Sequence, residues 1–153
     1  MKLPALSLLC WLTASSLSAQ VPSPREFLGH DIGADHFLAD YTQLRAYWKA
    51  LDEASDRLVV EEFGTTSYGQ PMVAAIVSAP QNLARLDEIR RVNRELALGR
   101  EDDEAAAIEA IEGNPAIVWI DAGMHATESV AAQNILELTW RLTSSDLDEV
   151  RRI

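Results

Sequence analysis

The sequence is poor in cysteine and has no basic run. Its 153 residues include one cysteine, Cys10, which excludes a disulfide framework and a zinc site made of cysteines. There are 13 Lys and Arg against 24 Asp and Glu, for a formal net charge of −11. Nucleic acids and anionic membranes bind basic surfaces, so we expect neither as a partner. With 7 Gly and 6 Pro, collagen-like and low-complexity classes are excluded as well.

Apolar runs are also few, and the one near the N-terminus is short. Residues 3–12 form an apolar stretch after Lys2, and the small residues Ser18 and Ala19 follow it. This arrangement is typical of a secretory signal peptide, and the stretch falls short of the ~20 residues that span a bilayer. We therefore expect residues 1–19 to be a cleaved signal peptide and the mature protein to be secreted or periplasmic, with no membrane span.

The mature chain begins with an arm that is expected to be extended, residues 20–40, because it contains prolines and glycines but no apolar period. Asp40 and Gln43 then resemble an N-terminal capping pair. Residues 41–55 carry apolar side chains at helical spacing, so an amphipathic helix is predicted there. The rest of the chain, 41–153, is expected to be one partial domain that is truncated at its C-terminus. The apolar side chains of the first helix are Leu44, Tyr47, Trp48 and Leu51.

The apolar patterns that follow predict two strands and several helices. Residues 58–63 and 72–77 are separated by a turn-rich segment, which indicates an antiparallel hairpin. A helix is predicted from Pro80 to about residue 98, and an acidic helix over 101–112. The continuous apolar run 116–120 is typical of a strand covered on both faces. A further helix is predicted from about Glu128, with apolar positions at Ala131, Ile135, Leu138 and Leu142.

One histidine and one glutamate follow this last strand. His125 and Glu128 come after Gly123, just before the expected helix. Ligands gather at the carboxyl ends of strands in open α/β sheets, and residues three apart on a helical turn share a face. Such an imidazole and carboxylate can supply two of the three protein ligands of a catalytic zinc ion. The spacing alone is common, so a helix-dipole role for Glu128 and an ordinary loop position for His125 stay open.

Three segments together resemble a known family. Residues 123–128, Gly-Met-His-Ala-Thr-Glu, resemble the first metal-binding motif of the zinc carboxypeptidases related to carboxypeptidase A. Residues 63–72 resemble the hairpin that opens the fold of that family. Residues 23–29 and 41–44 resemble the start of its large secreted bacterial members. The resemblance extends over about residues 24–142, which is most of the mature chain.

The resemblance implies an α/β fold, the N-terminal half of a mixed-sheet zinc carboxypeptidase, with an opening antiparallel hairpin, then a parallel strand, and helices on both faces. It implies Zn²⁺ as cofactor, His125 as first ligand and Glu128 as second. It also implies hydrolysis of C-terminal peptide bonds by metal-activated water, with peptide or protein C-termini as substrates. The third ligand, a histidine, and the catalytic glutamate of the family lie beyond Ile153, so no catalytic residue is assigned within this chain, and the chain alone is expected to be inactive. Thr127 stands where digestive members carry a substrate-binding arginine.

Two other functions remain open at this stage. A zinc-dependent deacylase or amidohydrolase of N-acyl amino acids shares the fold and the His-x-x-Glu element. A non-catalytic domain that binds peptides would keep the scaffold without the metal. His30 and His36, six residues apart in the arm, do not suit a helical ligand pair and are expected to be solvated.

Overall fold

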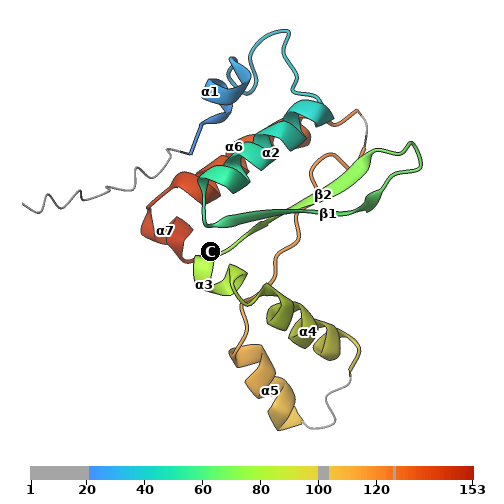
Figure 1. Ribbon diagram of the computed structural model, residues 1–153, viewed down its shortest axis with the longest axis vertical. Coiled ribbons are helices and arrows are strands. Elements are labelled where there is room, and N and C mark those ends of the chain that lie inside the picture. Colours follow the sequence, from blue (N-terminus) through green and yellow to red (C-terminus); the bar gives the residue numbers. More distant parts are fainter. Residues whose placement is uncertain (1–20, 100–103, 126) are drawn as a thin grey trace, which may run out of the picture.

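The computed structural model describes residues 21–99, 104–125 and 127–153 (Figure 1). The expected signal peptide, residues 1–19, lies outside the described residues. None of the described helices combines the length and the apolar character needed to cross a bilayer. In chain order the elements are α1 (Pro24–Leu28), α2 (Tyr41–Ala54), β1 (Leu58–Thr65), β2 (Pro71–Val77), α3 (Pro80–Leu83), α4 (Leu86–Ala97), α5 (Glu104–Glu112), α6 (Ser129–Ser144) and α7 (Asp148–Arg151).

Helix α2 begins where the sequence predicts, because Asp40 and Gln43 cap each other. The Gln43 backbone N–H donates to Asp40 Oδ1 at 2.8 Å, and the Asp40 backbone N–H donates to Gln43 Oε1 at 2.9 Å. These bonds satisfy backbone donors that a helix start leaves unpaired. On the apolar face, Tyr47 and Leu51 are completely buried. The predicted amphipathic helix is confirmed.

Strands β1 and β2 form the predicted antiparallel hairpin. Leu58 lies opposite Val77 and Val60 opposite Ala75. Since side chains alternate along a strand, these four side chains share one face of the hairpin. Leu58 belongs to the main core, and the other three pack against it. Helices α2 and α6 lie side by side over this face (Figure 1). The hairpin and its covering helices confirm that the chain is of the α/β class.

The core lies between α2, α6 and the hairpin. Its fully enclosed members are Tyr47, Leu51, Leu58 and Leu136. The buried face of α6 differs from the predicted one, because it is centred on Leu136 and includes polar side chains. Of the apolar positions expected on the buried face, Ala131 is exposed, and Ile135, Leu138 and Leu142 are half-buried. The polar residues buried on α6 are Gln133, Thr139 and Thr143.

The sequence predicts an extended N-terminal arm, but part of this arm is helical. Ser23 caps a short helix, α1, by accepting from the Glu26 backbone N–H, while the Glu26 side chain accepts from the Ser23 backbone. This capping box offsets the extended preference that the neighbouring prolines give the chain. Leu28 and Ile32 then pack against the main core. The arm is therefore held on the domain, while the predicted boundary at residue 40 stays a prediction.

The single helix expected from Pro80 is two helices, α3 and α4. The chain leaves helical geometry at Arg85, with φ −118° and ψ 27°, and the Arg85 guanidinium donates to the Gly113 carbonyl at 3.0 Å. Helices α4 and α5 extend away from the main body (Figure 1). Arg90 of α4 forms an ion pair with Glu61 of β1. Because side chains alternate along a strand, Glu61 lies on the face of the hairpin opposite to that of Leu58. This ion pair links α4 to the second face of the hairpin, while the expectation of helices packed on both faces stays a prediction.

The expected parallel strand at 116–120 is not seen. These residues form no strand in the described part of the chain, whose one sheet is the β1–β2 hairpin. A strand is defined by hydrogen bonds to a neighbouring strand, and the run finds no such neighbour there. Its apolar side chains are accordingly exposed, with Val118 80% and Trp119 69% accessible. The predictions of a buried strand and of a core position for Trp119 were wrong, whereas Trp48 and Trp140 do pack against the core.

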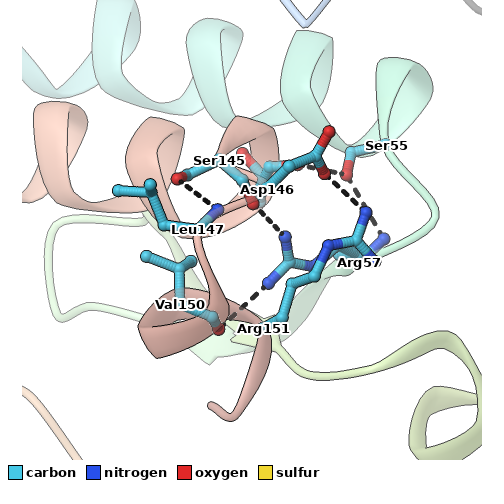
Figure 2. Close-up of polar contacts among 8 residues, drawn as sticks. Ser55, Arg57, Ser145, Asp146, Leu147, Val150 and Arg151 are labelled. Atoms are coloured by element: carbon cyan, nitrogen blue, oxygen red, sulfur yellow. Dashed lines mark hydrogen bonds and ion pairs between the residues drawn. The ribbon is translucent and has the colours of Figure 1, made fainter.

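Arg57 ties the C-terminal end of the chain to the start of β1 (Figure 2). Its guanidinium donates to the Ser145 carbonyl at 2.9 Å and to the Val150 carbonyl at 3.3 Å. The Ser55 hydroxyl donates to the Thr143 carbonyl at 3.2 Å. A cation near carbonyls that end a helix is favourable, so these contacts hold α6 and α7 against the hairpin.

Candidate metal centre

The candidate site is a turn between the exposed run 116–120 and α6. Gly123 has φ +91°, a backbone conformation that glycine adopts without a steric cost. A Cβ built on Gly123 would lie 3.5 Å from the Cβ of Ala132, so the turn lies directly against the first part of α6. The Glu128 backbone N–H donates to the His125 carbonyl at 3.0 Å. This bond closes the turn and brings the two predicted ligands to the same side.

The structure brings His125 and Glu128 together. His125 Nδ1 lies 3.0 Å from Glu128 Oε1, and the side chains are 68% and 57% exposed. Glu128 occupies the N-cap position of α6, but its side chain makes no capping hydrogen bond. The carboxylate therefore faces the imidazole instead of serving the helix end.

The pair has a donor set and a spacing that suit zinc. Imidazole nitrogen and carboxylate oxygen are both common zinc ligands. Two ligand atoms about 2.1 Å from one tetrahedral zinc ion lie roughly 3.4 Å apart, and the observed 3.0 Å separation needs little adjustment to match. Exposure leaves room for further ligands, so the residues present fit the metal as two members of a larger set.

A complete metal cage is not found within the described ranges 21–99, 104–125 and 127–153, since no group there joins three or more potential His, Cys, Asp or Glu ligands. The other histidines lie in the arm. His30 stacks on Phe37 with ring centroids 4.6 Å apart, and His36 adopts a positive φ of 62°. Neither histidine joins the pair formed by His125 and Glu128.

A hollow in the described part of the chain lies away from this turn. It measures about 1080 Å³ and is lined by the end of α2, the start of α3 and the end of α6, including Arg57 and Trp140. His125 and Glu128 are not among its lining residues. The candidate site is therefore an open turn at the surface, and it does not lie at the mouth of a covered strand as the sequence suggested.

Two features of α6 near the turn could not be read from the sequence. The position of Ala132 against Gly123 involves a small residue that carries no motif. Gln133, buried on the same helix, was passed over because a polar residue does not enter an apolar pattern. The positive φ of Gly123, by contrast, is a feature that a sequence signal, glycine in a turn, could have indicated.

Comparison with known protein families matches residues 44–153 to the family described as zinc carboxypeptidase. Comparison with curated proteins and with solved structures gives no significant match. The matched segment is more than half of the chain, and it contains both the hairpin and the turn that carries His125 and Glu128. The resemblance found in the sequence is thus confirmed, and the chain belongs to the zinc carboxypeptidase family.

Proposed function

We propose that this chain is the N-terminal part of an exported metallocarboxypeptidase and that His125 and Glu128 are two of its zinc ligands. The observation that supports the proposal is the 3.0 Å approach of His125 Nδ1 to Glu128 Oε1 inside the segment matched to the family. The substrates are peptide or protein C-termini, and the reaction is hydrolysis of the last peptide bond.

Each residue of the turn has a distinct task in this proposal. His125 offers an imidazole nitrogen, and Glu128 offers a carboxylate oxygen whose charge would offset part of the metal charge. Gly123 allows the reversal that sets both side chains on one side, and the Glu128 N–H bond to His125 keeps them there. When bound, zinc supplies a Lewis acid that polarises a carbonyl and lowers the pKa of a bound water molecule.

The remaining parts of the catalytic centre are proposed to come from residues outside this chain. The described residues offer no third ligand beside His125 and Glu128, and a catalytic zinc site usually has three protein ligands. A histidine and a general-base glutamate beyond Ile153 would complete it. We also propose that residues 1–19 direct export and are then removed, which N-terminal sequencing of the exported protein would test.

Zinc content tests the ligand assignment. The protein that contains this chain and its natural continuation is loaded with zinc, dialysed and analysed for metal, beside His125→Ala and Glu128→Ala. Both variants are expected to lose zinc, and His30→Ala is the matched control because it removes an exposed histidine of the arm. Equal zinc in wild type and His125→Ala would overturn the assignment.

A substrate panel tests the reaction. Release of the C-terminal residue from unblocked peptides, lost on removal of zinc, would support the carboxypeptidase. Preferential cleavage of N-acyl amino acids would instead indicate a deacylase of the same fold. Peptide binding without zinc and without turnover would indicate a non-catalytic domain.

A further inference from the structure

The side-chain amide of Gln133 joins α6 to the N-terminal arm. Its Oε1 accepts from the Ala39 backbone N–H at 2.9 Å, and its Nε2 donates to the Ala39 carbonyl at 2.9 Å. Gln133 is 7% exposed. One residue, 94 positions earlier in the chain, thus satisfies both polar ends of a buried amide. The two bonds resemble the pair that opposite residues of two antiparallel strands exchange.

Gln133 lies close to the candidate ligands along α6. It follows Glu128, the N-cap, by five residues, which is about 7.5 Å of helix. Its neighbour Ala132 lies beside Gly123 of the turn, with its Cβ 3.5 Å from the position that a Cβ on Gly123 would take. A rotation or shift of α6 would therefore move Glu128 directly and move His125 through the packing at Gly123.

Ala39 lies in a segment that other contacts hold in place. It packs against the main core and precedes Asp40, which caps α2. The next residue, Tyr41, donates from its hydroxyl to the Pro71 carbonyl at 2.7 Å, so this part of the chain is tied to both α2 and β2. The Gln133 amide thus connects α6 to a fixed part of the fold.

We infer that Gln133 is a positioning residue for the metal centre: its bonds to Ala39 set the rotation of α6 and hence the direction in which Glu128 and His125 project. This inference rests on the proposed function, because it takes that pair to be the zinc ligands. It also makes the arm, which precedes the family match at residue 44, a structural support of the site.

The test replaces Gln133 by methionine, which has a similar length but cannot exchange hydrogen bonds with Ala39. In characterised sites, replacing a group that hydrogen-bonds a zinc ligand changes zinc affinity by 10–100-fold. Gln133 acts on the ligands through α6, so we expect the lower end of that range. Roughly a tenfold increase in the zinc Kd is therefore expected, measured by chelator competition at a temperature where all variants are folded by circular dichroism.

Two controls separate positioning from other effects. Thr139→Val removes another buried polar group of α6, 3% exposed, whose hydroxyl bonds within the helix to Ile135 at 2.7 Å, so it reports general loss of stability. Asn134→Met changes an exposed neighbour of Gln133, so it reports mere proximity. Both are expected to keep the zinc Kd within about twofold of wild type, since among the described residues no hydrogen bond joins either of them to the arm.

A second readout needs no metal. The backbone amide signals of Gly123 and Glu128 in the NMR spectrum of the zinc-free protein are expected to shift in Gln133→Met and to stay in place in Thr139→Val. If wild type and His125→Ala bind zinc equally, the proposed function fails, while the amide signals still decide whether Gln133 positions the turn. If His125 is required for zinc but Gln133→Met matches wild type in both readouts, the inference on Gln133 is overturned.

Discussion

The Tyr47 hydroxyl donates a hydrogen bond to the Pro22 carbonyl at 2.8 Å. Tyr47 is the centre of α2 and fully buried, whereas Pro22 lies near the beginning of the described arm. One residue earlier in the arm, the Val21 carbonyl accepts from the Trp140 indole N–H at 3.4 Å. The arm is therefore fastened to two helices of the main body, one of which, α6, carries the candidate ligand Glu128 at its N-cap.

Replacing Tyr47 by phenylalanine should destabilise the protein by about 1 kcal/mol, because it removes one buried hydrogen bond while keeping the ring. Urea unfolding followed by circular dichroism measures the loss. Tyr41→Phe is the matched control, since it removes a similar hydrogen bond to the Pro71 carbonyl. Tyr41 is 42% exposed, so water can partly replace that bond. An equal loss in both variants would contradict the anchoring role of Tyr47.

The burial of Tyr47 should also make the folded protein less stable in alkali. Burial, together with the negative charges of Glu137 and Glu26, raises the pKa of Tyr47 above its ordinary value of 10.0. Above pH 10 the unfolded chain therefore releases this proton while the folded protein keeps it. The contribution to stability is full below that pH and declines as the pH rises, by at most about 1.4 kcal/mol per pH unit.

The measurement is the free energy of unfolding between about pH 9 and 11 in wild type and Tyr47→Phe. Other groups titrate in both proteins, so the difference between the two curves isolates Tyr47. Wild type should lose stability more steeply than the variant. Parallel curves would show that Tyr47 ionises alike in the folded and unfolded states.

Gly123→Ala should destabilise the protein by about 1–2 kcal/mol, because a side chain with a φ of this sign is strained. The contact with Ala132 at 3.5 Å is an ordinary one, so backbone strain and not a clash causes the loss. Gly64→Ala, at a glycine without a positive φ and with nothing within 4 Å, is the control and should change stability little. A harmless Gly123→Ala would contradict the geometry of the turn.

Arg57→Met should lower the free energy of unfolding by about 1–3 kcal/mol, since two backbone carbonyls lose a charged donor. It should also make the segment around α7 more sensitive to limited proteolysis. Arg151→Met is the control, because the Arg151–Asp146 pair in Figure 2 is exposed, with 59% and 82% of the side chains accessible, and such pairs contribute ~1 kcal/mol or less. Equal protection of α7 in Arg57→Met and wild type would contradict the role of Arg57.

The elements that could be predicted from the sequence are those whose cause is local. The cap of Asp40 and Gln43 spans four residues, and the apolar period that follows is enough to specify α2 and its buried face. The β1–β2 hairpin likewise follows from two short segments rich in apolar residues that are joined by a turn-rich segment. The spacing of His125 and Glu128 also lies within one turn, so the motif and its resemblance to the family were visible before the structure.

The elements that could not be predicted depend on distant partners. The apolar run 116–120 has the composition of a strand, yet a strand also requires a hydrogen-bonded neighbour, and within the described ranges the run has none. The buried face of α6 differs from the predicted one for a related reason: Gln133 is polar, and it is buried because Ala39 satisfies its amide.

By itself the sequence determined the family, the capped helix, the hairpin and the identity of the candidate ligand pair, because each of these depends on residues close together in the chain. The tertiary structure alone decided which face of α6 is buried and that Gly123 lies against Ala132. It also decided that His125 and Glu128 meet on an open turn. These outcomes depend on packing and hydrogen bonds between segments far apart in sequence, and no local pattern encodes which distant groups will be there to make them.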